Sequence, residues 1–424
     1  MTIISTQTPL QEIERSVQLI AHENDIDVTI VSNRPRLVGI INQEIDLWQQ
    51  RNSHRPLTDD SKRHISGRIE SNIVGYGPID SLLADDSVWE IMINAHDSIF
   101  IRRHGRGTTF HHESFHDPEH LRRTIARILS ENGLNQRKLE PADGLQDVQL
   151  AQGARLHIVH PDLTKEGSLI VNIRKFTGLP IRNISELIKR QMLSASAARF
   201  LLKAQEARST IIFAGPPGSG KTTLLGTLVG ELPPETRVTI AEEVLETLVE
   251  LPNVAHLQSR PTRSDRNGID LRTLVAGFLR MSPDFAIVGE VRDKEALPLI
   301  LTLSSGVPGY TTIHATSARA ALSRLRLLIQ IGGFQMPFSA VTQMVSDAVD
   351  LVVYANRIDG VPKVTEIVAV EDPNGGVDSN SFTTSTIFEL VDNKLVPSGL
   401  LPQRLRQKSR NKGIDITMEE LLND

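Results

Sequence analysis

The spacing of the hydrophobic positions changes along the first part of the chain, and each spacing predicts a different element. Leu10, Ile13, Val17 and Ile20 recur at intervals of three or four residues, which predicts an amphipathic helix. We therefore expect residues 1–60 to form a helical N-terminal extension. A further helix is predicted to start after it, over residues 61–74.

Alternating apolar and polar positions follow this helical part. They predict strands over 88–94 and 98–105, joined by a short turn into a β-hairpin. A helix is expected over 117–132, because Asp117 can cap its start and Pro118 suits its first turn. Three more strands, at 148–150, 154–160 and 168–176, complete an α+β N-terminal domain over 61–176. The turn-forming segment 177–180 is the predicted linker.

Beyond residue 181, apolar strands alternate with helical patterns. This alternation predicts an α/β fold with a mostly parallel sheet and helices on both faces, over 181–400. Residues 401–424 carry a basic run and then acidic residues, and we expect them to form a solvated, charged tail. The strands and the helix predicted in this domain are 210–215, 222–232 (helix), 237–241, 285–290 and 309–315.

Composition narrows the class of protein. A length of 424 residues with 39% hydrophobic residues fits two globular domains plus extensions. The net charge of -5 and the 4% aromatic content disfavour a nucleic-acid groove, so no stable nucleic-acid binding is expected. With no cysteine, disulfides and thiolate zinc sites are excluded. The N-terminus has no signal-peptide pattern, and no apolar run is long enough to span a bilayer, so a cytoplasmic protein is expected.

The segment GPPGSGKT at 215–222 lies between a predicted strand and a predicted helix. It matches the G-x-x-x-x-G-K-[ST] pattern of phosphate loops, whose glycines let backbone N–H groups approach phosphate oxygens. We expect Lys221 to contact the β- and γ-phosphates of ATP, and Thr222 to hold Mg²⁺. The predicted nucleotide-binding residues are Gly215, Pro216, Pro217, Gly218, Ser219, Gly220, Lys221, Thr222 and Thr223.

Polar residues follow several of the predicted strands, at the edge where α/β sheets bind ligands. Glu290 is expected to order the water shell of Mg²⁺ or to polarise the attacking water, which makes it a candidate catalytic and metal-binding residue. His314 could hydrogen-bond the γ-phosphate or be a satisfied core histidine. The acids Glu242, Glu243 and Glu246 either position a metal ion or water, or form an exposed helical face.

Four histidines, at positions 111, 112, 116 and 120, invite a metal-site interpretation. They fall at a loop and a helix start, with no strand or helix register that would place three ligands on one side. We therefore expect a solvated loop there.

Several motifs occur in the order found in the type II/type IV secretion ATPase superfamily, and the chain most resembles its tight-adherence (Tad) pilus branch. GYGPIDSLLADDSVWEIMINAHDSIFIRRHG is similar to the opening of that family's N-domain. The phosphate loop is followed by EEVLE, LRMSPDFAIVGEVRD and GYTTIHATSARAALSRL, which resemble the Asp box, the Walker B segment and the His box. The resemblance implies a RecA-like P-loop NTPase domain after the α+β domain.

The resemblance also implies roles for individual residues. It makes Glu242 the acid that activates water, Glu290 the Walker B acid and His314 a conformational histidine, while Arg155 and Arg174 match N-domain arginines that approach the phosphates. One additional residue, Ala241, precedes the acid pair, so the choice between Glu242 and Glu243 stays open. Gln149 stands where many relatives have arginine.

By this resemblance, the chain is expected to be a hexameric cytoplasmic ATPase that uses ATP and Mg²⁺. It would drive assembly of a type IV (Tad-type) pilus, or type II secretion, with an inner-membrane platform protein as partner. Association with the inner membrane would be peripheral. The alternatives are a type IV secretion or conjugation ATPase, a RecA-like nucleic-acid motor, and a scaffold that binds ATP without turnover.

Overall fold

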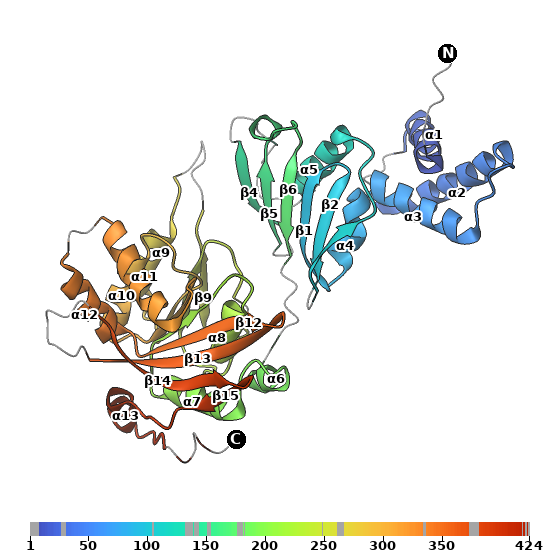
Figure 1. The fold of residues 1–424 in the computed structure, drawn as a ribbon. Helices are drawn as coiled ribbons and strands as arrows, with labels where there is room; N and C mark the ends of the chain where they lie inside the picture. Colours follow the sequence, from blue (N-terminus) through green and yellow to red (C-terminus); the bar gives the residue numbers. More distant parts are fainter. Residues whose placement is uncertain are drawn as a thin grey trace. The chain divides into compact units, whose positions relative to one another are not determined.

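The chain divides into two compact units, residues 1–177 and 178–424 (Figure 1). The predicted linker at 177–180 lies outside the described residues. No helix in the described part of the chain is long and apolar enough to cross a membrane. The computed structural model describes residues 8–26, 31–103, 106–131, 139, 144–150, 154–175, 181, 183–247, 249–260, 267–333, 336–372, 381–417, 419 and 422.

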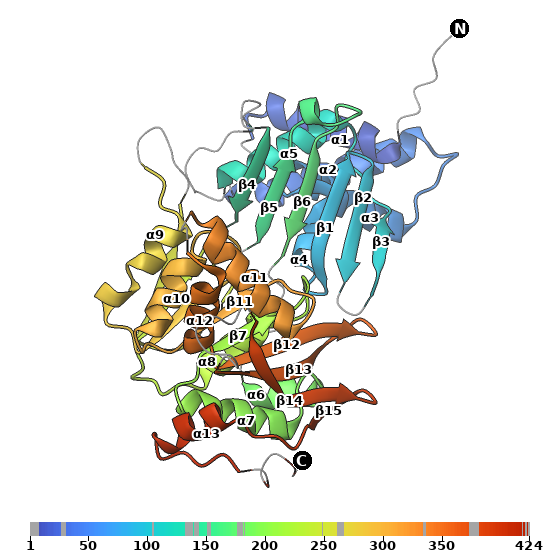
Figure 2. The same cartoon turned by 60° about the vertical axis from the view of Figure 1, so that its left-hand side comes forward.

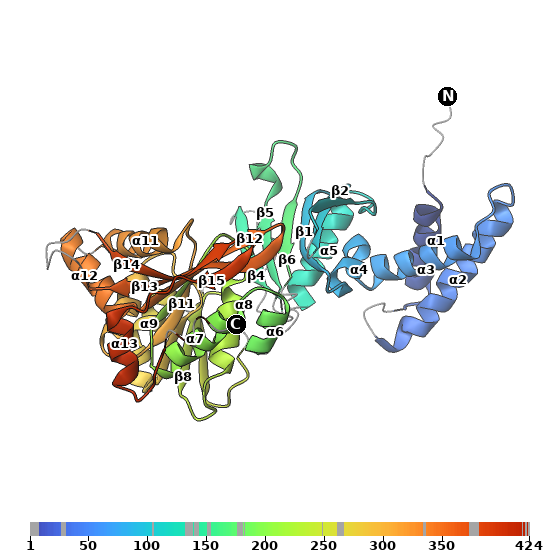
Figure 3. The same cartoon turned by 60° about the horizontal axis from the view of Figure 1, so that its bottom comes forward.

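Three helices pack together at the start of unit 1 (Figure 3). The first has the predicted apolar face: Ile13 and Val17 are buried, and they share a core with Ile41 and Ile69 of the next two helices. Because the third helix contributes to this core, the bundle extends to Ile73, and the boundary predicted at residue 60 is wrong. The helices are α1 (Pro9–Glu23), α2 (Arg34–Arg51) and α3 (Asp59–Ile73).

An antiparallel six-stranded sheet follows in the order β3-β2-β1-β6-β5-β4. Alternate residues of β1, such as Ile91 and Ile93, are fully buried and share a core with Ile125 of α5. Asp117 caps α5 as predicted, since its Oδ1 accepts the N–H of His120 at 2.7 Å. The elements are α4 (Asp80–Ala84), β1 (Val88–Ala95), β2 (Ser98–Arg103), β3 (Thr108–His111), α5 (Pro118–Glu131), β4 (Leu145–Gln149), β5 (Arg155–Val159) and β6 (Ile170–Arg174).

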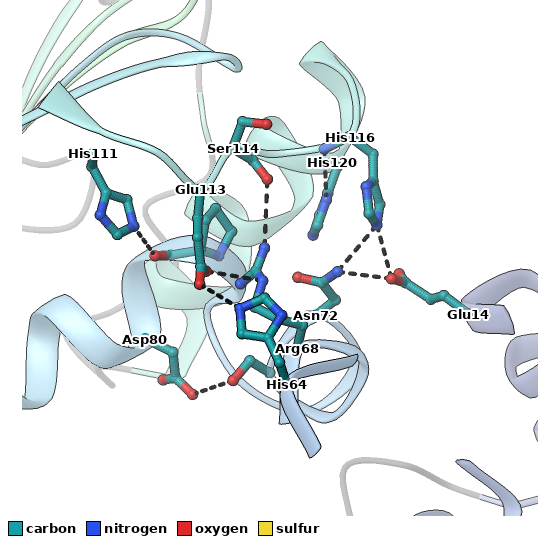
Figure 4. A network of polar contacts seen from close by, with 12 residues as sticks. Glu14, His64, Arg68, Asn72, Asp80, His111, Glu113, Ser114, His116 and His120 are labelled. Carbon is teal, nitrogen blue, oxygen red and sulfur yellow. Dashed lines mark hydrogen bonds and ion pairs between the residues drawn. The ribbon is translucent and has the colours of Figure 1, made fainter. Parts of the chain in front are cut away.

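A polar network connects α1 with α3 and with the segment before α5 (Figure 4). Oε2 of Glu14, itself buried, accepts a hydrogen bond from Nδ2 of Asn72 at 2.7 Å and lies 2.8 Å from Nε2 of His116. His116 in turn donates its backbone N–H to Nδ1 of His120 at 3.3 Å. Burial, and secondly the proximity of His116, lower the pKa of His120 to about 4.

The solvated loop predicted for the four histidines is therefore wrong for His116 and His120. His120 is only 5% exposed, and His116 is held by Glu14, because α1 and α3 pack over this segment. Among the residues that the structure describes, no group of three or more His, Cys, Asp or Glu side chains could hold a metal ion.

Unit 2 is built on a nine-stranded sheet in the order β15-β14-β13-β12-β7-β11-β10-β8-β9. The strands from β12 to β9 in that order pair in parallel, as predicted, and their carboxyl ends meet at one edge. Helices α9 to α12 cover one face and α6, α7, α8 and α13 the other (Figure 2). The parallel strands are β7 (Ile211–Ala214), β8 (Val238–Glu242), β9 (Val254–Gln258), β10 (Phe285–Val288), β11 (Gly309–Ile313) and β12 (Leu351–Ile358).

Helices α8 to α12 lie between these strands in the chain, which gives the α/β order predicted from the sequence, whereas α6 and α7 precede β7 and α13 follows the last strand. They are α6 (Ile184–Lys189), α7 (Ala195–Glu206), α8 (Lys221–Gly230), α9 (Leu271–Ala276), α10 (Ala296–Ser304), α11 (Ala318–Ile331), α12 (Phe338–Ala348) and α13 (Gln403–Arg410).

The last part of the chain extends the sheet and then packs against it. Strands β13 (Val361–Glu371), β14 (Thr383–Val391) and β15 (Lys394–Pro397) continue the sheet in antiparallel order. In α13, Leu405 is 2% exposed and belongs to the core, while Nζ of Lys408 lies 2.6 Å from the buried carboxylate of Asp350. The solvated tail predicted for 401–424 is wrong for the segment around α13, because Leu405 and Ile416 are buried in the core and Arg404 and Lys408 bond to the domain.

Candidate nucleotide-binding site

The phosphate loop lies at the carboxyl edge of the parallel sheet, between β7 and α8. Its backbone requires glycine: Gly215 has a φ of 151°, and a Cβ added there would lie 2.0 Å from the carbonyl oxygen of Ala355. The first hydrogen bond in the helical pattern runs from Leu224 N to Gly220 O, so the amides of the first turn have no acceptor within α8. Amides of this kind at a helix N-terminus are suited to bind phosphate oxygens.

Lys221 is the first residue of α8 and only 6% exposed. Its Nζ donates to the carbonyl oxygen of Pro216 at 2.9 Å and lies 3.3 Å from Nδ1 of His314. From this position over the loop, the ammonium group can turn to a phosphate with little rearrangement. Thr222, half-buried, follows it on the first turn and offers the hydroxyl that was predicted to hold Mg²⁺.

His314 joins the phosphate loop to Glu290. Its Nε2 lies 3.1 Å from Oε1 of Glu290, and its Nδ1 lies 3.2 Å from the carbonyl oxygen of Gly215 as well as near Lys221. A carboxylate only accepts, so the contact with Glu290 requires a proton on Nε2. In the neutral ring with that proton, Nδ1 can accept from Lys221. The structure thus brings three predicted residues, Lys221, His314 and Glu290, into one polar chain.

Glu242 is the last residue of β8 and lies directly beside Gly289, since a Cβ at Gly289 would be 2.5 Å from its Oε1. Its carboxylate is 4% exposed and already has several donors. Thr247 donates its hydroxyl at 2.6 Å and its N–H at 3.1 Å, and Nε2 of His256 lies 2.6 Å away. Through its hydrogen bonds with Thr247, Glu242 fixes the loop that follows β8. Burial and these donors keep it in place.

Glu243 is more open than its neighbour. Its side chain is 42% exposed and forms an ion pair with Arg292, which follows Glu290 in the chain. The loop carrying Arg292 is itself fixed by Glu295, whose Oε1 accepts the N–H groups of Arg292 and Asp293 at 2.6 and 2.8 Å. Of the two alternative acids, Glu242 is thus buried and already accepts several hydrogen bonds, whereas Glu243 is accessible to solvent.

Arg155 and Arg174, the predicted N-domain arginines, are direct cross-strand partners on β5 and β6 of unit 1. Arg174 also pairs in register with Glu90, whose carboxylate bonds Arg102 at 2.8 Å. Within the described residues, neither Arg155 nor Arg174 forms an ion pair. Like charges directly opposite one another in a sheet repel, and a bound anion would relieve that repulsion.

Sequence reasoning did not find three of the residues around this site. His256 and Thr247 hold Glu242, and Arg357 of β12 donates from Nε to the carbonyl oxygen of Gly218 at 2.8 Å. Arg357 and Gly218 are 139 positions apart. No local pattern marks these residues, because their roles depend on which strands lie side by side.

Comparisons with known proteins identify the family of the chain. A family described as Type II/IV secretion system protein matches residues 72–373. A putative conjugal transfer protein of Mycobacterium tuberculosis is 27% identical over 318 residues, covering 73% of this chain and 88% of that protein. The type IV secretion system protein PtlH of Bordetella pertussis is 34% identical over 252 residues, covering 53% and 73%. VirB11 of Bartonella henselae is 26% identical over 327 residues, covering 68% and 90%.

Solved structures that match this chain include the VirB11 ATPase of the Brucella suis type IV secretion system. It has 24% identity, a TM-score of 0.35, and coverage of 73% of this chain and 94% of that one. The pilus retraction motor PilT with bound ADP has 16% identity and a TM-score of 0.48, with coverage of 79% and 85%.

Proposed function

Because the chain belongs to the type II/IV secretion system protein family and is an ATPase, we propose that it is a hexameric motor that drives assembly of a type IV pilus of the tight-adherence type, or type II secretion. The observation that supports this most is the polar chain from Lys221 through His314 to Glu290 beside a complete phosphate loop. Such a chain connects phosphate binding with the group expected to act on water. The motor would bind the cytoplasmic face of the inner membrane through a platform protein.

Each residue of the site has a part in hydrolysis. The amides of the first turn of α8 and Nζ of Lys221 bind the phosphates, and Lys221 leaves the carbonyl oxygen of Pro216 to do so. The hydroxyl of Thr222 and the carboxylate of Glu290 are oxygen donors, which suit Mg²⁺. When bound, Mg²⁺ neutralises charge on the phosphates. Glu290 orients water, directly or through the metal's water shell.

His314 reports whether Lys221 is engaged by phosphate. Without phosphate, Nδ1 of His314 lies within reach of both Lys221 and the carbonyl oxygen of Gly215. When Lys221 turns to the nucleotide, His314 loses this donor and is free to follow Glu290 or a phosphate oxygen. His314 is then a switch between two hydrogen-bonded states.

Arg155 and Arg174 are proposed to stabilise the charge that develops on the transferring phosphoryl group. Two guanidinium groups opposite one another, without carboxylate partners among the described residues, favour a polyanion. Planar donor forks suit phosphate oxygens. On this proposal, turnover depends on Arg155 and Arg174, and nucleotide binding depends on the phosphate loop.

For Glu242 and Glu243, the proposal follows the resemblance and assigns water activation to Glu242. Its position one strand from Glu290, against Gly289, supports this. Glu242 would act only after its loop releases the hydrogen bonds from Thr247 and His256, whereas the accessible Glu243 remains the alternative.

A second candidate function is a type IV secretion or conjugation ATPase. The names of the similar proteins favour it, since they include a conjugal transfer protein and type IV secretion proteins. The two functions differ in the membrane partner. Affinity purification of Lys221→Ala and wild-type chains from detergent-solubilised membranes, with the partners identified by mass spectrometry, separates them. A pilus platform protein supports the first function, and a conjugation or secretion channel component supports the second.

Deletion of the gene provides the corresponding test in cells. Loss of surface pili with unchanged DNA transfer supports pilus assembly. Loss of DNA transfer with normal piliation and normal type II secretion contradicts the first function and supports the second. Complementation with wild type, and failure of complementation with Lys221→Ala, would tie either result to ATP turnover.

A further inference from the structure

The last residues of β12 run beside the phosphate loop. β12 pairs in parallel with β7 up to Tyr354, opposite Ala214, and then continues to Ile358 after β7 has ended. On the side where β7 has ended, the last residues of β12 lie against the phosphate loop, while β13 still pairs with them on the other side. The first contact is a close approach of two backbones, because the carbonyl oxygen of Ala355 occupies the place where a side chain of Gly215 would be.

Arg357 makes a second contact, and it is a polar one. Its Nε donates to the carbonyl oxygen of Gly218 at 2.8 Å, and its Nη1 donates to the carbonyl oxygen of Gly360 at 3.0 Å. Both glycines have positive φ, 72° for Gly218 and 80° for Gly360. One planar guanidinium group thus connects the phosphate loop with the turn between β12 and β13.

The same hairpin supports the loop at a third point. The terminal methyl of Met192 lies 2.5 Å, and Cβ of Pro362 3.5 Å, from the place of a Cβ at Gly220. Met192 is in turn fixed to β13, since its carbonyl oxygen accepts the N–H of Val364 at 2.8 Å. The outer side of the loop is therefore covered by β12, β13 and Met192.

The conformation of a phosphate loop explains why such support is useful. A loop that turns its N–H groups toward an anion turns carbonyl oxygens the other way, and these need donors of their own. The carbonyl oxygen of Pro216 receives Nζ of Lys221, which is expected to leave when phosphate binds. The carbonyl oxygen of Gly218 accepts a hydrogen bond from Arg357, which is not expected to leave when phosphate binds.

We propose that Arg357 is a positioning residue for ATP binding. It holds Gly218 so that the loop keeps its phosphate-binding shape before the nucleotide arrives, which lowers the cost of ordering the loop on binding. Its Nε and Nη1 both donate to backbone carbonyls, so Arg357 acts through the loop. The inference rests on the proposed nucleotide site at Lys221.

The test compares three full-length variants with the wild type. Arg357→Gln removes the charged fork, and Arg357→Lys keeps the charge but cannot span both carbonyl oxygens with a planar fork. Arg208→Gln is the matched control, because Nη2 of Arg208 also donates to a backbone carbonyl oxygen, that of Asp284 at 3.0 Å, and Arg208 precedes β7 whereas the phosphate loop follows it. For each protein, the Kd of a fluorescent ADP analogue, kcat from phosphate release at saturating ATP, and the melting temperature are measured.

Arg357→Gln loses the charged hydrogen bond that shapes the loop. This loss should weaken nucleotide binding by about tenfold or more, while kcat stays within about threefold of the wild-type value. The Kd of Arg357→Lys should lie between those of Arg357→Gln and the wild type, and Arg208→Gln should bind nucleotide as the wild type does. If Arg357→Gln does not fold, Arg357→Lys alone should show the increase in Kd at a wild-type melting temperature.

Two results would overturn the proposal: an unchanged Kd in both Arg357 variants, or a loss of kcat without a change in Kd, which would make Arg357 a catalytic residue. Failure of the nucleotide site itself is distinguishable. In that case Lys221→Ala would bind the ADP analogue as tightly as wild type, whatever the Arg357 variants do.

Discussion

Nε2 of His314 lies 3.1 Å from Oε1 of Glu290, while Nδ1 of the same ring lies 3.3 Å from Nζ of Lys221. Lys221 follows β7 and the phosphate loop, Glu290 follows β10 and His314 follows β11. Their contacts join them into one hydrogen-bonded cluster. A change at the phosphate loop can therefore reach Glu290 through two hydrogen bonds. Single substitutions in and around this cluster should therefore separate nucleotide binding from turnover.

Replacing Lys221 with alanine should abolish ATP turnover and weaken nucleotide binding. Lys221 supplies the side-chain cation of the loop that was predicted to contact the β- and γ-phosphates. Titration with a fluorescent ATP analogue and phosphate release measure the two effects. Lys294→Ala, which removes an exposed lysine of unit 2, is the control and should behave as wild type. Wild-type turnover in Lys221→Ala would disprove the assignment of the loop.

The variants Glu242→Gln and Glu243→Gln decide which acid activates water. We expect Glu242→Gln to lose most of its turnover with ATP binding retained, and Glu243→Gln to keep its turnover. Glu242→Gln should also lower the stability by about 1–3 kcal/mol, because an amide cannot accept all the hydrogen bonds that the buried carboxylate accepts. Comparison of kcat and thermal unfolding for both variants measures this. The reverse pattern of turnover would assign water activation to Glu243.

Alanine at Arg155 or Arg174 should leave ATP binding nearly unchanged and reduce hydrolysis, by up to about a thousandfold if each acts as an arginine finger. Neither change should lower the melting temperature, since the two cations repel one another across β5 and β6. Arg122→Ala is the control, because Arg122 is exposed on α5 and pairs with Glu119 of the same helix. Unimpaired turnover in both variants would contradict a role of Arg155 and Arg174 in hydrolysis.

The sequence predicted the elements around the phosphate loop well, because strand, loop and helix are contiguous there and each has a local pattern. Lys221, His314 and Glu290 could be placed at one edge for the same reason: each follows or begins an element of a parallel sheet. The hydrogen bonds that join them, and the neighbours His256 and Arg357, could not, because they depend on strand order. The buried α13 was missed because its many cations concealed the apolar side of Leu405.

His120 should make the stability of the protein depend on pH. Burial lowers its pKa to about 4, so the unfolded chain takes up a proton between about pH 6.5 and 4 while the folded chain does not. The contribution of neutral His120 to the free energy of unfolding is fully present above pH 6.5. It decreases as the pH falls toward 4, by about 1.4 kcal/mol per pH unit. The free energy of unfolding of His120→Gln should therefore fall less steeply than that of wild type over this range.

The exposed His112 provides the control for this pH dependence. Unfolding of His112→Gln by denaturant should follow the wild-type pH profile. Equal slopes for wild type and His120→Gln would show that His120 is protonated as easily in the folded chain as in the unfolded one.

The most direct test of a hydrolysing site at the phosphate loop is to measure ATP binding and phosphate release in the same preparation of Glu290→Gln. Glutamine keeps the size of the side chain and a contact with His314 but removes the charge that acts on Mg²⁺ or water. The account predicts nucleotide affinity close to wild type and phosphate release reduced by about a hundredfold or more. Phosphate release at the wild-type rate, or a loss of binding as large as the loss of turnover, would contradict it.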